Sequence, residues 1–339
     1  MESYNKIYIL APYKIATGGV ELAHQIIDFL RKKNLEAYVV YIENNAISEN
    51  QDITKEYIKY NIKTTNHIED SKNNFLILPE VFYDWIYKYK KIEIGCWWMS
   101  VDNHYKTCCF KDALNFQKGI LNKLRYLPKY FAHKSFKNKI SDLKKQEDRI
   151  WHFYQSHYAQ FHLYSLGMSK VLPLSDYINT DFKCQISEQE KEDIILYNPK
   201  KGYEYISKLK TLMPNYEFKG LNGYNRDELK EIFKKSKLYI DFGNFPGKDR
   251  LPREAVANNC CIITGTKGAS YFFEDIPISE KYKFNIDKTP STAIIEMIKY
   301  VLNNYSECIK DFQFMKKQIE NEESIFYREI EFFFICNKS

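Results

Sequence analysis

One segment of the chain, residues 238–268, constrains the fold more than any other. It begins with a short apolar run (238–242), continues through a loop rich in glycine, asparagine and proline, and ends with a second apolar run (260–264) and another glycine-containing loop. Short apolar runs bounded by such turn residues are typical of strands buried in a parallel sheet. Parallel strands need a crossover connection, so the segment predicts a β-loop-α-β unit.

The connection in this unit is predicted to be a helix that begins near Pro252 and ends at Asn258 and Asn259. Proline suits the first position of a helix, and a glutamate in the first turn suits its positive end. Both loops of the unit follow parallel strands, and ligands bind at that edge of such sheets. Charged residues are dense there, and they are Lys248, Asp249, Arg250, Arg253, Glu254 and Lys267. The pattern predicts an anionic ligand.

The same unit resembles the donor-binding signature of retaining nucleotide-sugar glycosyltransferases of the GT-B fold, the family-four group. The residues that match are 251–252, 254–255, 262–263 and 265–268. The resemblance implies that Glu254 binds the ribose hydroxyls of the nucleotide. Many members carry another glutamate eight residues earlier, where this chain has Pro246, and Asp249 or Lys248 is the candidate for that role.

Near the start of the chain, an apolar strand is predicted over residues 6–11, and a helix from about residue 20 to 33 follows Gly18 and Gly19. A glycine pair between a strand and a helix can seat a phosphate, because the backbone N–H groups there point at the anion. A Gly-Gly turn is also common without any ligand. GT-B enzymes carry a similar Gly-Gly-x-Glu segment, so the resemblance implies that Gly18 and Gly19 face the donor diphosphate.

A strand over residues 93–98 carries two tryptophans and is followed by a polar group that includes Asp102 and His104. Two interpretations are open. The segment is either an aromatic core strand with an ordinary turn, or an acceptor site. In an acceptor site, Trp98 or Tyr105 would stack on a sugar, and Asp102 or His104 would act as a catalytic group at the acceptor hydroxyl. The similarity to GT-B enzymes here is one of position.

The second half of the chain opens with a strand at 194–197 and a turn at 198–202. In GT-B enzymes the corresponding turn carries a cation that contacts the donor phosphates, and Lys201 is the candidate, with Lys200 as the alternative. Arg250 joins Lys201 in the predicted catalytic set, because cations stabilise a departing diphosphate.

The predicted donor site is completed by Lys248, Arg253 and Gly268. No Asp-x-Asp motif occurs, so we expect a metal-independent reaction without a cofactor, in which the nucleotide sugar is a substrate.

Residues 118–145 contain nine Lys or Arg and one acidic residue, interleaved with apolar and aromatic side chains. Such a segment is typical of a surface that meets an anionic membrane, and a solvated helical face is the alternative. Nucleic acid is disfavoured, because the net charge of +6 is modest and no nucleic-acid-binding module is recognisable.

A chain of 339 residues with 44% hydrophobic content is long enough for two domains. No run approaches the roughly 18 apolar residues of a spanning helix, and the first ten residues lack a secretion signal. The eight cysteines show no metal-binding C-x-x-C spacing, which indicates unpaired thiols. We therefore expect a cytoplasmic protein, peripheral on the inner face of the membrane.

Taken together, the sequence predicts an α/β fold of two Rossmann-like domains that face each other across a cleft (GT-B). Residues 1–183 are the predicted acceptor domain, 184–305 the donor domain, and 306–339 a terminal helix that packs back on the first domain. The predicted function is transfer of a hexose-like sugar from a nucleotide diphosphate to a glycan or lipid-linked acceptor, with retention, in surface polysaccharide synthesis. A nucleotide-sugar epimerase and a non-catalytic membrane-associated adaptor are the alternatives.

Overall fold

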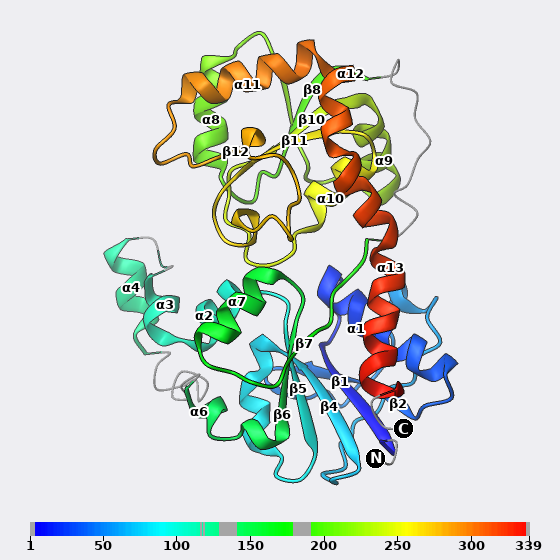
Figure 1. Ribbon diagram of the computed structural model, residues 1–339. Helices are drawn as coiled ribbons and strands as arrows, with labels where there is room; N and C mark the ends of the chain where they lie inside the picture. Colours follow the sequence, from blue (N-terminus) through cyan, green and yellow to red (C-terminus); the bar gives the residue numbers. More distant parts are fainter. Residues whose placement is uncertain (1–3, 116, 118, 129–140, 179–190, 337–339) are drawn as a thin grey trace. The chain divides into compact units, whose positions relative to one another are not determined.

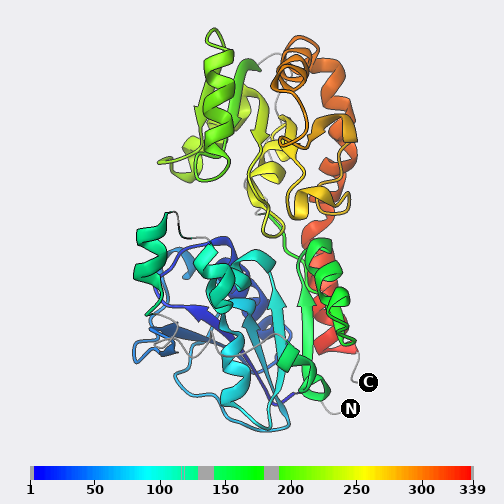
Figure 2. The same ribbon diagram turned by 90° about the vertical axis from the view of Figure 1, so that its left-hand side faces the viewer.

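The computed structural model describes residues 4–115, 117, 119–128, 141–178 and 191–336 (Figure 1). The chain divides into two compact units, and each is built around its own sheet (Figures 1 and 2). Unit 1 comprises Met1–Asp176 and Ile325–Ser339, and unit 2 comprises Tyr177–Ser324. The domain boundary predicted at residue 183 lies outside the described residues.

Seven strands form the sheet of unit 1, in the order β3-β2-β1-β4-β5-β6-β7. Their bounds are β1 (Lys6–Pro12), β2 (Ala37–Glu43), β3 (Ala46–Ile47), β4 (Asn74–Pro79), β5 (Glu93–Trp98), β6 (Ile150–Tyr154) and β7 (Val171–Pro173). All neighbours pair in parallel except β2 and β3. The strand order reverses between β1 and β4, which is the switch point of a doubly wound sheet.

Helices cover both faces of this sheet. They are α1 (Gly18–Lys32), η1 (Lys55–Tyr57), η2 (Glu80–Lys88), α2 (Val101–Cys108), α3 (Phe110–Asn115), α4 (Ile120–Tyr126), α6 (Ser141–Lys144), η4 (Glu147–Arg149), α7 (His157–Ser165) and the last part of α13 (Gln313–Phe334). Because successive strand residues point to opposite faces, each strand contributes to two cores. Strands covered on both faces are apolar throughout, which is why the sequence shows them as continuous runs.

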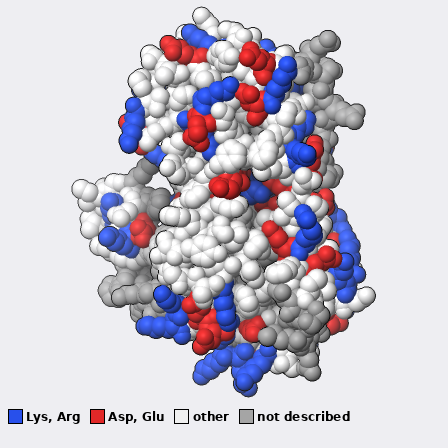
Figure 3. All heavy atoms as spheres, in the orientation of Figure 1, with Lys and Arg blue, Asp and Glu red and all other residues white. Residues whose placement is uncertain are grey.

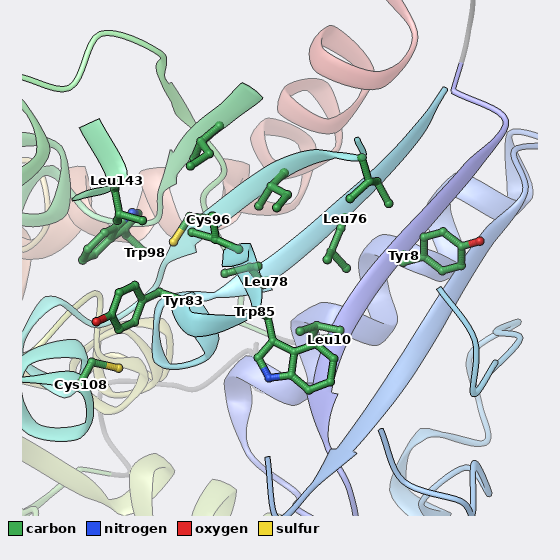
Figure 4. Close-up of a cluster of buried hydrophobic side chains, with 14 of the residues drawn as sticks. Tyr8, Leu10, Leu76, Leu78, Tyr83, Trp85, Cys96, Trp98, Cys108 and Leu143 are labelled. Carbon is green, nitrogen blue, oxygen red and sulfur yellow. The ribbon is translucent and has the colours of Figure 1, made fainter. Parts of the chain in front are cut away.

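One of the two cores contains Leu76, Leu78 and Trp98, together with Trp85 of η2 (Figure 4). On the opposite face, Phe75 and Phe153 meet Phe333 of α13, at 5.2 and 4.8 Å between ring centroids. Gly95 lies between these two phenylalanines. A larger residue does not fit there, because a Cβ would lie 2.3 Å from the Phe153 ring and 2.8 Å from the Phe75 ring. The core of unit 1 is therefore aromatic on the α13 side.

Five strands form the sheet of unit 2, in the order β12-β11-β10-β8-β9, and all neighbours are parallel. Their bounds are β8 (Glu192–Tyr197), β9 (Glu217–Gly220), β10 (Ser236–Asp241), β11 (Cys261–Gly265) and β12 (Lys283–Phe284). The helices are α8 (Tyr203–Leu212), α9 (Arg226–Lys235), α10 (Arg250–Ala257), η7 (Ala269–Tyr271), η8 (Glu280–Tyr282), α11 (Ser291–Asn303), α12 (Tyr305–Cys308), η9 (Ile309–Phe312) and the first part of α13. The strand order reverses between β8 and β10, so the switch point lies there.

The structure corrects one helix start. Helix α10 begins at Arg250, with Asp249 as its N-cap, so Pro252 is the third helical residue and not the first. Proline fits there as well, because the N–H of the third residue has no partner within the helix. Glu254 is consequently beyond the first turn, one turn after Arg250.

The surface carries charges of both signs. On the face drawn in Figure 3, groups of Lys and Arg side chains lie next to groups of Asp and Glu side chains, with uncharged residues between them. Within the described ranges, no helix is both long and apolar enough to cross a membrane. The seven cysteines in these ranges form no disulfide bond, and Cys184 lies outside them.

Candidate functional site

The topology of unit 2 directs attention to the ends of β8 and β10. These strands are neighbours at the point where the strand order reverses. In doubly wound sheets, ligands bind at the carboxyl ends of the strands on either side of that point. The loop after β8 carries Lys201, and the loop after β10, residues 242–249, leads into α10. We call residues 243–249 the β10 loop.

Two glycines allow these loops to touch. Gly202 has φ of +66°, and a Cβ on it would lie 2.7 Å from the backbone nitrogen of Gly243. A Cβ on Gly243 would in turn lie 2.7 Å from Cγ of Lys201. Side chains at either position would push the loops apart, so the glycines serve loop packing and hold the Lys201 side chain against the β10 loop.

Two carboxylates share the ammonium group of Lys201. Its Nζ lies 3.1 Å from Oδ2 of Asp241 and also forms an ion pair with Asp249. Asp241 is buried, and its carboxylate also accepts hydrogen bonds from the Tyr239 hydroxyl and the Gly243 N–H, both at 2.9 Å. The charge of Lys201 is therefore neutralised by these carboxylates, and the Gly243 N–H already donates to Asp241.

Asp249 has an unfavourable environment for its charge. Burial raises the pKa of the Asp249 carboxyl, and the charge of Lys201 acts in the opposite direction. An anion that drew Lys201 away would leave Asp241 and Asp249 without their shared cation. Because unpaired buried carboxylates are costly, we expect such a ligand to be accompanied by proton uptake at Asp249.

Helix α10 presents an arginine and a glutamate one turn apart. Nε of Arg250 lies 3.6 Å from Oε1 of Glu254, and Glu254 is 6% exposed. The Arg250 guanidinium, which only donates hydrogen bonds, and the Glu254 carboxylate, which only accepts them, thus lie on the helix that follows the β10 loop. A guanidinium and a carboxylate in this arrangement can bind a phosphate and a hydroxyl pair, respectively.

The other two predicted cations meet a third carboxylate. Arg253 is 1% exposed, and its Nη1 lies 2.9 Å from Oε2 of Glu322 on α13. Nζ of Lys248 lies 2.9 Å from Oε1 of the same residue. Sequence reasoning missed Glu322, although a signal was present. Glu322 interrupts an apolar stripe with helical spacing, which consists of Met315, Ile319, Phe326 and Ile330.

The loop after β11 joins the β10 loop through its backbone. The N–H of Phe245 donates to the Lys267 carbonyl at 3.2 Å, and the N–H of Ala269 donates to the Phe245 carbonyl at 2.9 Å. Gly268 has φ of +67°, and a Cβ there would lie 2.0 Å from the Phe245 carbonyl oxygen. Gly268 is thus required for the close approach of two loops at the candidate site.

In unit 1, Gly18 and Gly19 are the first two residues of α1. A Cβ on Gly19 would lie 3.3 Å from the Met99 side chain. The N–H of Met99 donates to Oε2 of Glu80 at 3.1 Å. Burial raises the pKa of Glu80 to about 8, while hydrogen bonds such as the one from Met99 act in the opposite direction. We therefore expect the Glu80 carboxyl, at the switch point of unit 1, to be protonated at neutral pH.

Asp102 and His104 both lie on α2. Asp102 accepts a hydrogen bond from the Tyr158 hydroxyl at 2.9 Å. His104 is fully buried, and its Nδ1 lies 3.0 Å from the Glu80 carbonyl oxygen. Because a carbonyl only accepts, Nδ1 carries the proton, and Nε2 has no hydrogen-bond partner among the described residues. Burial lowers the pKa of His104 to about 4, so the ring is neutral.

The sugar-stacking role considered for Trp98 is wrong. Trp98 is fully buried, and its indole N–H donates to Nδ1 of His152 at 3.2 Å. The strand is an aromatic core strand, as the alternative interpretation held. The catalytic roles of Asp102 and His104 stay predictions.

The predicted site residues fall into two groups by unit. Unit 2 brings together Lys201, Lys248, Arg250, Arg253, Glu254 and Gly268 around the ends of β8, β10 and β11. Unit 1 contains Gly18, Gly19, Asp102 and His104. Within the ranges that the structure describes, no group of three or more His, Cys, Asp or Glu is placed to hold a metal ion.

No protein-family model matches this chain, and no curated protein sequence does either. Solved structures are similar over nearly its whole length. The sucrose-phosphate synthase of Thermosynechococcus elongatus aligns with a TM-score of 0.59 at 10% identity, over 96% of this chain and 97% of that one. HepE of Anabaena, in complex with UDP-glucose, aligns with a TM-score of 0.56 at 10% identity, over 96% and 98%. WaaG, a glycosyltransferase involved in lipopolysaccharide biosynthesis, aligns with a TM-score of 0.55 at 12% identity, over 96% and 97%.

Proposed function

We propose, from the GT-B fold that this chain has, that the protein transfers a sugar from a nucleotide-diphosphate donor to an acceptor. A fold alone does not determine an activity, so the proposal depends on the site. The observation that carries it is the set of Lys201, Arg250 and Glu254 at the switch point of unit 2. HepE, which shares the fold, holds UDP-glucose in its solved structure.

Each of these side chains has a role that its chemistry suits. Glu254 accepts hydrogen bonds from the ribose hydroxyls, because a carboxylate binds two neighbouring hydroxyls well. Lys201 and Arg250 bind the diphosphate and stabilise its charge as the bond to the sugar breaks. Lys201 reaches the phosphates by giving up its ion pair with Asp249, and Asp249 then takes up a proton.

Unit 1 contains the remaining residues of the proposal, two for the donor diphosphate and two for the acceptor. Gly18 and Gly19 begin α1, whose N-cap Thr17 makes no side-chain capping hydrogen bond, so backbone N–H groups remain for a phosphate. Asp102 or His104 acts at the acceptor hydroxyl, and the reaction retains the anomeric configuration. Asp102 is the more accessible of the two, because its side chain is partly exposed whereas His104 is fully buried. A glycan or lipid-linked acceptor in surface polysaccharide synthesis is supported by the likeness to WaaG.

Helix α4 supports a peripheral contact with a membrane. Three of its side chains are strongly exposed although apolar, with exposed fractions of 78% for Ile120, 72% for Leu121 and 56% for Leu124. Lys123 and Arg125 lie on the same helix. Apolar side chains with neighbouring cations suit an anionic leaflet. Much of the predicted basic segment 118–145, including residues 129–140, lies outside the described residues.

The donor is tested first by binding. Thermal unfolding is measured with UDP, GDP, CMP and their sugar conjugates, and a ligand at 100 times its dissociation constant should add about 2.7 kcal/mol of stability. The stabilising nucleotide sugar is then incubated with and without candidate acceptors. A transferase needs an acceptor or slowly hydrolyses the donor, whereas an epimerase converts the donor alone. If no nucleotide or nucleotide sugar stabilises the protein, the proposal fails.

A further inference from the structure

A single carboxylate on α13 contacts two segments that are far from it in the sequence, residues 248–253 and Ile178. Oε1 of Glu322 binds Nζ of Lys248 at 2.9 Å, and Oε2 binds Nη1 of Arg253 at 2.9 Å. Oε2 also accepts the N–H of Ile178 at 3.4 Å. Glu322 is 6% exposed, so these contacts form in a nearly dry environment.

Arg253 extends this connection to the backbone of the β10 loop. Its Nε donates to the Asp249 carbonyl at 3.2 Å, and its Nη2 donates to the Lys248 carbonyl at 3.1 Å. The planar guanidinium thus holds the last two residues of the loop while Glu322 holds the guanidinium. Asp249 in turn forms the ion pair with Lys201, so an unbroken series of contacts leads from Glu322 to Lys201.

We propose that Glu322 is a positioning residue of the nucleotide-sugar site, an inference that rests on the proposed function. It anchors the β10 loop through Arg253 and Lys248, and the anchored loop holds Asp249 and Lys201 where the diphosphate binds. Lys248 and Arg253 are both paired with the Glu322 carboxylate. These two cations therefore fix the loop, and Lys201 and Arg250 meet the phosphates.

The chemistry of the carboxylate explains why a neutral amide cannot replace it. Glu322 uses both oxygens as acceptors, each toward a cation. A glutamine has the same shape but offers one acceptor oxygen and one donor NH₂ group, so it faces one cation with a donor. Glu322→Gln should therefore release either Lys248 or Arg253, and the loop loses an anchor.

The first test compares nucleotide affinity in matched variants. Glu322→Gln, Glu322→Asp and the control Glu320→Gln, an exposed position on the same helix, are titrated calorimetrically with UDP and with GDP well below their melting temperatures. We expect Glu322→Gln to weaken the affinity about tenfold, Glu322→Asp to weaken it less because the charge remains, and Glu320→Gln to match wild type. A lower melting temperature with wild-type affinity in Glu322→Gln would make the role merely structural and overturn the proposal.

A second measurement needs no ligand. Hydrogen exchange of the amides in residues 243–249 should be faster in Glu322→Gln than in Glu320→Gln, and equal rates would overturn the anchoring role. This separates the two proposals. If no nucleotide or nucleotide sugar stabilises wild type but the loop amides of Glu322→Gln still exchange faster, the proposed function fails and the anchoring stands. Should Glu322→Gln not fold, Lys248→Met, which removes the less buried partner, is expected to speed the same exchange.

A double variant distinguishes positioning from direct binding by Lys248. If Lys248 acts on the nucleotide only through the loop, Glu322→Gln combined with Lys248→Met should bind UDP or GDP no more weakly than Glu322→Gln alone. If the double variant loses more nucleotide affinity than Glu322→Gln alone, Lys248 binds a phosphate directly. That result would overturn the proposal that Lys248 acts only by pairing with Glu322.

Discussion

Glu254 is the residue for which the proposed site makes the simplest prediction. Charge-assisted hydrogen bonds contribute about 1.5 to 3 kcal/mol, so we expect Glu254→Ala to weaken nucleotide binding roughly ten- to a hundredfold. We expect the fold to change little, because Glu254 forms an ion pair within its own helix, with Arg250 at 3.6 Å. Calorimetric titration with the stabilising nucleotide measures the loss. Wild-type affinity in this variant would remove Glu254 from the site.

Lys201 should affect stability as well as binding, because two carboxylates depend on it. Asp241 is buried, whereas the Lys201 and Asp249 side chains are 20% and 25% exposed, so we expect Lys201→Met to lower the free energy of unfolding by less than the roughly 3 to 5 kcal/mol of a fully buried pair. Adding Asp249→Asn should restore part of that stability by removing a carboxylate that has lost its cation. Urea unfolding measures the stability of both variants. If the double variant is no more stable than Lys201→Met alone, the two carboxylates do not share Lys201 as their cation.

Buried titratable groups in unit 1 give stability two opposing pH dependences. Burial raises the pKa of Glu80 to about 8, so its contribution is complete below about 4.5 and is lost as pH rises through 8. Burial lowers the pKa of His104 and of His152 to about 4, so their contribution is complete above about 6.5 and is lost as pH falls toward 4.

Glu80→Gln tests the loss of stability that Glu80 should cause as the pH rises. The amide retains an acceptor for the Met99 N–H but does not ionise. One pH unit is worth about 1.4 kcal/mol for a group that is ionised in the unfolded state alone. We therefore expect the stability of Glu80→Gln relative to wild type to increase by roughly 2 to 3 kcal/mol between pH 5.5 and 7.5. Urea unfolding at each pH measures it, and a difference that does not vary with pH would show that Glu80 is ionised in the fold.

At the scale of elements, the sequence predicted best those strands that are buried on both faces. Strands β1, β10 and β11 were predicted nearly to their ends, because strands covered on both faces are apolar throughout. The same uniformity hid which face each residue occupies, so Trp98 was considered as a sugar platform although it is a core residue. The start of α10 was misplaced because proline suits the third helical residue as well as the first.

Contacts between distant elements were beyond sequence reasoning. The order of the strands in unit 2 and the pairing of Arg253 with Glu322 depend on how elements pack, which no local pattern specifies. Lys201 and Glu254 became candidates through the resemblance to GT-B enzymes, after the strands that precede them had been located from apolar runs. Glu322 was not identified, because its only local sign is a charge within the apolar stripe of α13.

Lys191 is an example of such packing, because it joins the ends of two helices. Its Nζ donates to the carbonyls of Phe233 and Ser236 at the end of α9, both at 2.9 Å, and to that of Asn258 at the end of α10, at 2.6 Å. A cation suits helix C-termini, where carbonyl groups lack partners.

Replacing this lysine should destabilise unit 2 without disturbing the nucleotide site at the opposite end of the strands. Lys191→Met removes the lysine donor from three buried carbonyls, of which those of Phe233 and Ser236 retain the weaker Cys260 thiol as a donor, so we expect a loss of roughly 1 to 3 kcal/mol. Urea unfolding measures the loss, and Lys235→Met, an exposed lysine of α9, is the control. Equal stability of the two variants would contradict a capping role.

At the scale of the whole molecule, the fold persists although little of the sequence is shared. Identities of 10 to 12% accompany alignments over 96% of the chain, which means that the pattern of buried strands and helices is retained and most individual residues are not. This pattern is what made the two-domain α/β fold predictable. The choice of donor and acceptor depends on a few side chains, so it does not follow from the fold.

The surface also suggests membrane association. Helix α4 carries both cations and exposed apolar side chains, so variants of it can measure the electrostatic and the apolar contribution to membrane binding separately. Each cation near an anionic surface contributes about 1 kcal/mol, so neutralising Lys123 and Arg125 with glutamine should weaken binding to phosphatidylserine vesicles about thirtyfold at low salt. Because salt screens charges, the wild-type protein should lose much of the same binding at high salt.

The apolar component should not depend on salt. Replacing Ile120, Leu121 and Leu124 with serine removes exposed apolar surface and keeps both cations, so binding should weaken at low and high salt alike. Turnover of a soluble acceptor should stay unchanged in both variants, because α4 contributes none of the proposed site residues. Vesicle sedimentation measures binding. If both variants bind anionic vesicles as wild type does at low salt, α4 is a solvated surface helix and the protein does not use it to reach a membrane.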